Sequence, residues 1–303
     1  MPTKAFQQFH PVIGSLTAYQ ASNKLEEIGY SDIAKTIRFE GGEKLFSSIN
    51  WPGSNQPRPW QYTSHAFGFI SPTSSKTEPV DIIEAGGIEP DTSLRNSRIK
   101  VALSRLRVFD YPGGGIHQIL FDFYGQNQVQ GQTEDVHFTQ TYRVQQGEQA
   151  GIIGYPVFIG LNVGSEGVDF QCHTVNVKNE EDEKLIEFLD SDIFKKGLSL
   201  VSTLNPAVPV ITSFATGLTN AIANRNSNVG VQQFYMGLDF SDNPMGARLA
   251  QGSYIAVQVP RAEEWDWTKW VFNPKNGQIV PRDNLTGSVP YNYLVFSVDK
   301  MSS

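Results

Sequence analysis

The sequence has one cysteine, Cys172, among 303 residues. A single thiol excludes an intrachain disulfide and is typical of proteins in a reducing compartment. The N-terminal residues lack the charged and then apolar segments of a secretory signal. No run of about 18 apolar residues is present that could cross a bilayer as a helix. We therefore expect a soluble, cytoplasmic protein, with export by a signal-independent route left open.

Charged side chains are scarce as well. They make up 18% of the residues, and the formal net charge is −7. No cluster of Lys and Arg stands out along the chain. Because proteins hold nucleic acids largely through basic side chains on phosphates, we expect no nucleic-acid partner.

Motifs that mark catalysis or cofactor binding are missing. The triple glycine at 113–115 lacks the lysine of a phosphate-binding loop and predicts a turn. Residues 164–167 (Gly-Ser-Glu-Gly) do not have the GxSxG spacing of a nucleophile elbow and also predict a turn. We expect no catalytic residues, no cofactor and no metal, and the protein is predicted not to be an enzyme.

Histidine and acidic residues leave two alternatives open. His117, His137 and His173 fall on three predicted strands, and neighbouring strands could unite them in an imidazole site. Ordinary sheet positions are the favoured interpretation. A calcium site in the turns that contain Asp110, Asp239 and Asp242 is likewise less favoured than solvated turn residues, because Ca²⁺ needs several converging oxygens.

Turn formers and aromatic residues, in contrast, are plentiful: 27 Gly, 17 Pro, 19 Phe and 11 Tyr. Alternating apolar residues at short intervals predict many strands, which is typical of a sandwich or barrel. Residues 98–124 are predicted to form a hairpin around the turn at 111–115. We predict a mainly β (α+β) fold, an antiparallel β-sandwich that forms a single domain over 1–303, with residues 1–95 as an alternative N-terminal subdomain. The predicted strands are 60–70, 99–109, 116–124, 136–144, 151–163, 168–177, 231–240, 252–259 and 291–298.

In three places the spacing of apolar residues changes from that of a strand to that of a helix. Asn23 and Glu26 have the spacing of a capping box and predict a short helix near the N-terminus. A pair of helices is predicted as an insertion at about 180–225. The second of these carries an apolar stripe that is a candidate interface, made of Ile211, Phe214, Leu218 and Ile222.

Residues 206–224 are apolar and almost uncharged, so a membrane-active role is an alternative for this segment. Fifteen helical residues reach roughly 22 Å, which is short of the hydrocarbon core. Basic residues are absent from its polar face, and packing on the sheet or on another subunit is favoured. The order of strands, helical pair and strands resembles the architecture of C2-type lipid-binding sandwiches and some pore-forming toxins, although no motif carries this likeness.

All five tryptophans fall in two loop regions, and they are candidate binding residues: Trp51, Trp60, Trp265, Trp267 and Trp270. Exposed indole rings stack on sugars, prolines or partner side chains. The competing interpretation is that the rings close one end of the sandwich.

The sequence thus favours a non-catalytic binding or assembly protein that uses aromatic loops and an apolar helix. A protein partner or self-association into an oligomer is expected. Membrane activity through 206–224 and carbohydrate binding through the tryptophans are the alternatives.

Overall fold

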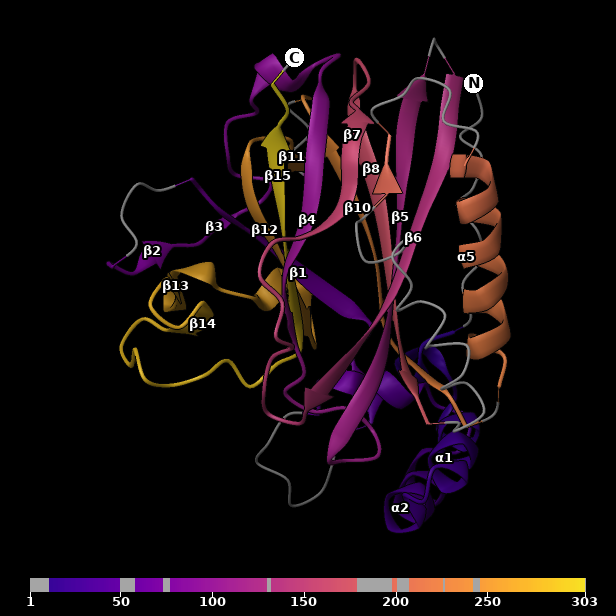
Figure 1. The fold of residues 1–303 in the computed structure, drawn as a ribbon. Helices are drawn as coiled ribbons and strands as arrows, with labels where there is room; N and C mark the ends of the chain where they lie inside the picture. Colours follow the sequence, from indigo (N-terminus) through magenta and orange to yellow (C-terminus); the bar gives the residue numbers. More distant parts are fainter. Residues whose placement is uncertain are drawn as a thin grey trace.

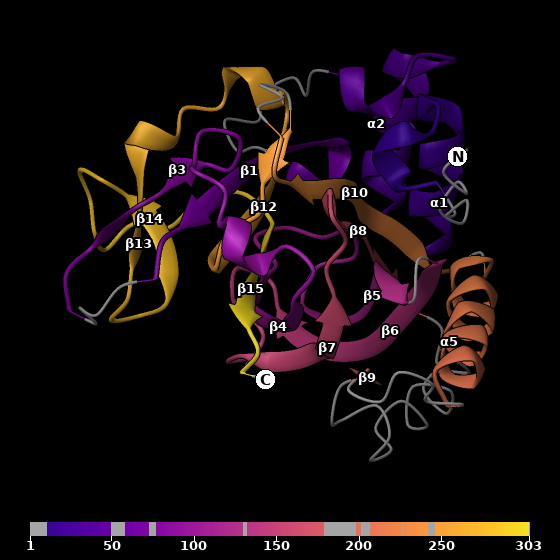
Figure 2. The same ribbon diagram turned by 90° about the horizontal axis from the view of Figure 1, so that it is seen from above.

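The protein is a mainly β structure in which two large sheets face each other (Figures 1 and 2). The computed structural model describes residues 11–49, 58–72, 77–129, 132–178, 198–200, 207–225, 227–241 and 246–302. The sandwich predicted from the sequence is confirmed.

The first sheet has seven strands, in the order β3 (Ile83–Glu84), β1 (Ser64–Ile70), β12 (Gly252–Val259), β15 (Tyr293–Lys300), β4 (Arg98–Arg107), β7 (Tyr155–Asn162) and β9 (Leu198–Ser199). Adjacent strands in this sheet are antiparallel, except for β7 and β9, which are parallel.

The second sheet has five strands, in the order β11 (Ala247–Arg248), β10 (Val229–Asp239), β8 (Gly167–Val177), β5 (Ile116–Val129) and β6 (Gln132–Gln145). Only β10 and β11 are parallel. A third, small sheet of β14 (Gln278–Pro281), β13 (Trp270–Asn273) and β2 (Val80–Asp81) lies beside the first one (Figure 1).

Aromatic side chains fill the space between the two large sheets. The ring centroid of Phe123 lies 5.4 Å from that of Phe170 and 5.6 Å from that of Phe296, which belongs to the opposite sheet. Phe158 joins the same group at 6.0 Å. Each of these rings is almost completely buried, so alternate residues of β5, β8 and β15 form the core while their neighbours face outward.

The predicted hairpin at 98–124 is wrong. β4 belongs to the seven-stranded sheet and β5 to the five-stranded sheet, so the loop at 108–115 crosses from one sheet to the other. The alternation of apolar residues is the same for both topologies, because each strand has one face on the same core. The hairpin partner of β5 is β6, and their pairing runs without interruption from Ile116 and Gln145 to Val129 and Gln132.

The N-terminal helix also begins earlier than predicted. α1 (Ala18–Glu27) starts from a capping box formed by Thr17 and Gln20, whose side chains and backbone N–H groups bond reciprocally. Ala18, Ala21 and Leu25 lie on its buried face. α2 (Ser31–Gly41) follows and packs against α1 at one end of the sandwich (Figure 1).

The helical insertion is described in part. Its first helix, predicted around 180–197, lies outside the described residues. The second is α5 (Ala207–Ala223), which covers the outer face of the five-stranded sheet beside β6 (Figures 1 and 2). No helix in the described part of the chain is both long and apolar enough to cross a membrane. Short 3₁₀ turns complete the fold at Ile13–Ser15, Phe46–Ser48, Pro59–Gln61, Thr92–Leu94, Ala262–Glu264 and Trp267–Lys269.

Candidate functional site

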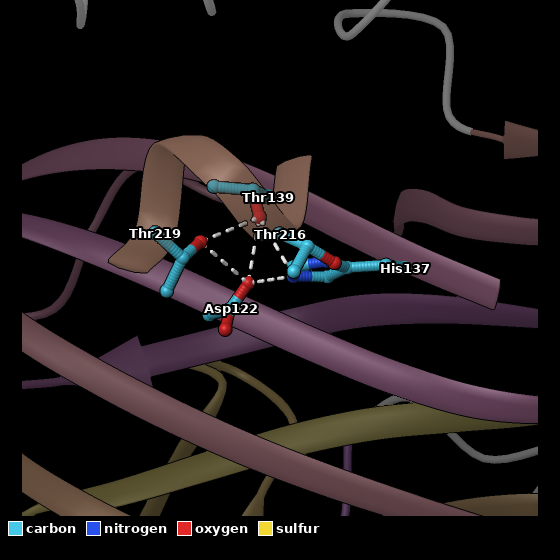
Figure 3. Close-up of polar contacts among 5 residues, drawn as sticks. All are labelled: Asp122, His137, Thr139, Thr216 and Thr219. Atoms are coloured by element: carbon cyan, nitrogen blue, oxygen red, sulfur yellow. Dashed lines mark hydrogen bonds and ion pairs between the residues drawn. The ribbon is translucent and has the colours of Figure 1, made fainter. Parts of the chain in front are cut away.

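A cluster of polar side chains lies between α5 and the five-stranded sheet (Figure 3). Asp122 of β5 accepts hydrogen bonds on Oδ1 from the hydroxyls of Thr139 at 2.6 Å and Thr219 at 3.1 Å, and the same oxygen contacts Nε2 of His137. On the other side of the imidazole, Nδ1 lies 3.0 Å from the hydroxyl of Thr216. We call these five residues the polar cluster.

The strand register explains why these residues meet. Asp122 is paired with Thr139 on β6, and Tyr124 is paired with His137. Directly paired residues, and residues two apart along a strand, share one face of a sheet. Thr216 and Thr219 are three residues apart in α5, so they share one face of the helix. Two strands, β5 and β6, and the helix α5 therefore contribute residues to the polar cluster.

The geometry of the cluster has the order carboxylate, imidazole, hydroxyl. A reactive triad would need a hydroxyl that a substrate can reach. Here Asp122, His137 and Thr139 are fully buried and Thr219 is only 2% exposed, the hydroxyl next to Nδ1 belongs to the half-buried Thr216, and the ring of Tyr124 stacks on His137 with centroids 3.7 Å apart. This arrangement is suited to holding α5 on the sheet.

Apolar contacts continue the same interface. Leu218 and Ile222 of α5 are buried against three side chains of the sheet, Leu120, Val175 and Val177. Two of the four predicted interface residues therefore face the protein's own sheet. The side chains of the other two, Ile211 and Phe214, lie outside the described residues.

The three histidines that were considered as a metal site lie on neighbouring strands, as predicted, but not on one face. His173 is the register partner of Asp122, so it shares the outer face with His137. His117 is five residues before Asp122 on β5, so it points to the other face and contacts the ring of Tyr111. Among the described residues, no group of three or more His, Cys, Asp or Glu side chains could hold a metal ion.

The tryptophans are placed by the structure mainly in packed positions. Trp60 is fully buried, and its indole N–H donates to Asp110 at 2.9 Å. Trp267 is 7% exposed and belongs to the core between the seven-stranded and three-stranded sheets. Trp265 and Trp270 are half-buried and stack on each other with centroids 5.3 Å apart. Trp51 lies outside the described residues.

Three of the exposed large apolar side chains lie on the two N-terminal helices or shortly after them. Phe39 of α2 is 93% exposed, Tyr19 of α1 is 50% exposed and Leu45, just after α2, is 54% exposed. Tyr19 donates its backbone N–H to the carbonyl of Gly42, and Leu45 forms a bridge with Thr17, so these segments lie together. We call Tyr19, Phe39 and Leu45 the helical-pair patch.

A cavity of about 320 Å³ lies at the end of the five-stranded sheet where β5 and β10 finish and β8 begins. Its polar lining residues include Gln126, Gln128, Glu166, Asp169 and Asp239. We call it the acidic pocket.

Sequence reasoning missed the polar cluster, the helical-pair patch and the acidic pocket. One signal was available for the first of these, because Asp122 interrupts the apolar run from Ile119 to Tyr124. A carboxylate in such a run must be paired if the strand is buried on both faces.

Comparison of the chain with protein families, with curated proteins and with solved structures finds no match.

Proposed function

We propose that this protein is a non-catalytic assembly protein that associates with further copies of itself through α1 and α2. The observation that carries the proposal is the helical-pair patch. A large apolar side chain such as Phe39 at 93% exposure has a favourable transfer free energy that only a partner can release.

The charges around the patch favour a second copy of this chain as the partner. Exposed side chains of both signs lie on the same two helices and directly after α2: Glu26, Glu27, Asp32 and Glu43, and Lys35, Arg38 and Lys44. Of these, Arg38 already pairs with Glu26 at 2.9 Å. A two-fold contact places a surface against itself, so a patch with both signs at its rim can pair each charge with its opposite. Nucleic acid and anionic lipid would instead require an excess of basic residues.

Other surfaces give weaker support to the alternatives considered from the sequence. Membrane action through 206–224 would require α5 to leave the sheet, where Leu218 and Ile222 are buried. Carbohydrate binding would require open indole faces, whereas Trp60 and Trp267 are buried. Self-association therefore ranks first.

The test is size-exclusion chromatography with light scattering over a wide range of protein concentration. We expect the wild-type protein to show a defined mass above that of the monomer. Phe39→Asp should shift the equilibrium towards monomer by roughly thirtyfold in Kd, which corresponds to the ~2 kcal/mol typical of a central aromatic contact. Because Phe39 is almost fully exposed, this variant should fold normally.

Leu285→Asp is the matched control, since Leu285 is 42% exposed and lies next to the three-stranded sheet, away from α1 and α2. It should assemble like the wild type. A wild-type monomer at every concentration would overturn the proposal. Co-migration of the wild type with neutral or anionic vesicles, without self-association, would also overturn it and would favour membrane binding.

A further inference from the structure

Two arginines of β4 lie beside the core between the seven-stranded sheet and the small sheet. Arg105 and Arg107 are two residues apart, so they share one face of the strand. Their register partners on β15 are Val295 and Tyr293, which both belong to that apolar core. Arg107 is 4% exposed, so folding removes its charged group from bulk water.

The charge of Arg107 has no partner in the described part of the chain. No hydrogen bond or ion pair there includes its side chain, and Nε is buried without an acceptor. A guanidinium group keeps its proton in a protein, so burial cannot neutralise it as it can neutralise a lysine or a carboxylate. Buried charges are therefore almost always paired. An unpaired Arg107 is a site at which an external anion would be stabilised.

Arg105 adds a second positive charge on the same face. Its Nε donates to the carbonyl of Gly277 at 2.9 Å, and Nη1 donates to the carbonyls of Ser104 at 2.6 Å and Ile152 at 2.9 Å. These acceptors are neutral, so they fix the direction of the side chain without cancelling its charge. Gly277 has φ of +67°, and a Cβ there would collide with Nη2 of Arg105. The turn between β13 and β14 can therefore cover this arginine only with glycine.

A buried phenol lies near both guanidinium groups. Tyr293 is fully buried, and its hydroxyl oxygen accepts from the backbone N–H of Ile279 at 3.4 Å. Burial raises the pKa of this hydroxyl, and the charges of Arg107 and Arg105 act in the opposite direction. The hydroxyl therefore keeps its proton at neutral pH, and none of the hydrogen bonds among the described residues uses that O–H as a donor.

The unused donors select the class of ligand. Arg107 and Tyr293 offer N–H and O–H groups, and no ion pair within the described ranges includes either arginine, so an anion is favoured over a cation. The planar fork of an arginine matches the two oxygens of a carboxylate. Gln149, which is bridged to Arg107, has a buried Oε1 without a partner among the described residues. A phosphate would bring further oxygens near this acceptor, whereas the rest of a carboxylic acid is carbon.

We propose that Arg107, supported by Arg105 and Tyr293, binds the carboxylate group of a small organic acid beside the small sheet. Arg107 forms the bidentate pair, Tyr293 donates its O–H, and Arg105 adds positive charge from a fixed position. Because only 4% of Arg107 is exposed, a compact acid such as acetate fits better than a bulky one. No residue of α1 or α2 takes part, so this site and self-association are tested separately.

Thermal unfolding at neutral pH in acetate, phosphate or acetamide, with one ionic strength set by sodium chloride, tests the proposal. Acetate at roughly 100 mM, about a hundredfold excess over a Kd near 1 mM, should raise the melting temperature of the wild type by about 4 °C. Acetamide has the same shape without the charge and should leave the melting temperature unchanged. A rise with phosphate alone would overturn the choice of a carboxylate, and no rise with acetate would overturn the site.

Three variants make the result specific. Arg107→Met removes the charge and should abolish the response to acetate, while its melting temperature without acetate should be no lower than that of the wild type, since an unpaired buried charge is gone. Arg107→Lys keeps the charge without the fork and should weaken acetate binding by at least about tenfold. Arg143→Gln removes an exposed guanidinium group of β6 and should respond like the wild type.

An equal response to acetate in Arg107→Met and the wild type would refute the proposal, as would a response lost equally in Arg143→Gln. If Arg107→Met does not fold, Arg107→Lys decides, because an unaltered affinity for acetate in that variant would also refute the proposal.

Discussion

Replacing His137 by alanine should destabilise the protein strongly, because it removes one partner from a carboxylate that has no access to water. Asp122 is fully buried, and Oδ2 makes no hydrogen bond to any described residue. Without the imidazole, only the hydroxyls of Thr139 and Thr219 would face the carboxylate. Breaking a buried pair on one side typically costs ~3–5 kcal/mol, and losing the ring stack on Tyr124 adds about 1 kcal/mol. We expect His137→Ala to lose about 4–6 kcal/mol of unfolding free energy.

Asp122→Asn tests this reasoning further, because its effect on stability should be opposite in the wild type and in the His137→Ala variant. In the wild type the carboxamide replaces a carboxylate that three donors approach, so the substitution should destabilise. In the His137→Ala background it removes an uncompensated buried charge, so the double variant should be more stable than His137→Ala alone. Thr216→Val, which removes only the hydroxyl next to Nδ1, should cost about 1 kcal/mol.

Urea unfolding followed by circular dichroism and tryptophan fluorescence measures these differences, provided that the two probes coincide and the slope with urea is unchanged. A loss below about 1 kcal/mol for His137→Ala would refute the reasoning, since such a value is typical of a partner that water can replace. Failure of Asp122→Asn to recover stability in the double variant would refute the role assigned to the carboxylate.

Four further results are expected. Trp267→Ala should lower the melting temperature with a loss of about 3–5 kcal/mol, because the ring is buried between two sheets; a near-normal melting temperature would place the ring on the surface. Gly68→Ala should cost about 1–3 kcal/mol, as its Cβ would lie 2.7 Å from Cη2 of Trp267, and an unchanged melting temperature would contradict that packing. Burial lowers the pKa of His65 to about 4, and burial together with Lys178 lowers that of His117 to about 4. Since both values lie below the ordinary pKa near 6.5, the free energy of unfolding should be highest above that pH and should fall by roughly 1.4 kcal/mol per pH unit for each histidine as the pH drops from about 6 to 4. A His65→Gln variant with an unaltered pH profile would count against this expectation. Burial raises the pKa of the Cys172 thiol, so an aromatic disulfide reagent should modify it only after denaturation, and rapid reaction of the native protein would show that the site opens.

The sandwich and α5 could be predicted from the sequence because the spacing of apolar residues is enough to identify strands and helices. Alternation marks the faces of β4 and β8, and the spacing of Leu218 and Ile222 marks the buried stripe of α5. The start of α1 was missed because two segments match a capping box. Thr17 with Gln20 prevails over Asn23 with Glu26 since Ala18, Ala21 and Leu25 then face the core together.

The polar cluster and the pocket could not be predicted in the same way, because they depend on which strands become neighbours. Asp122 and Thr219 are 97 residues apart in sequence, and no local pattern relates a strand to a helix at that distance. The crossing between β4 and β5 is hidden for a similar reason, as a strand shows the same alternation whichever sheet it joins. The burial of Trp267 could not be predicted either, because the small sheet that covers it is assembled from β2, β13 and β14, which are not all neighbours in the sequence.

The central position of β15 in the seven-stranded sheet has a consequence for the order of folding. β15 lies between β12 and β4, and its pairing with β4 joins residues from distant parts of the chain. During synthesis, β4 therefore emerges long before the strand that will cover its edge. Closure of such non-local pairs is slow, and an edge that waits for its partner can recruit strands from other chains. Expression at low temperature or with a holding chaperone should then increase the yield of native protein more than any change on its finished surface.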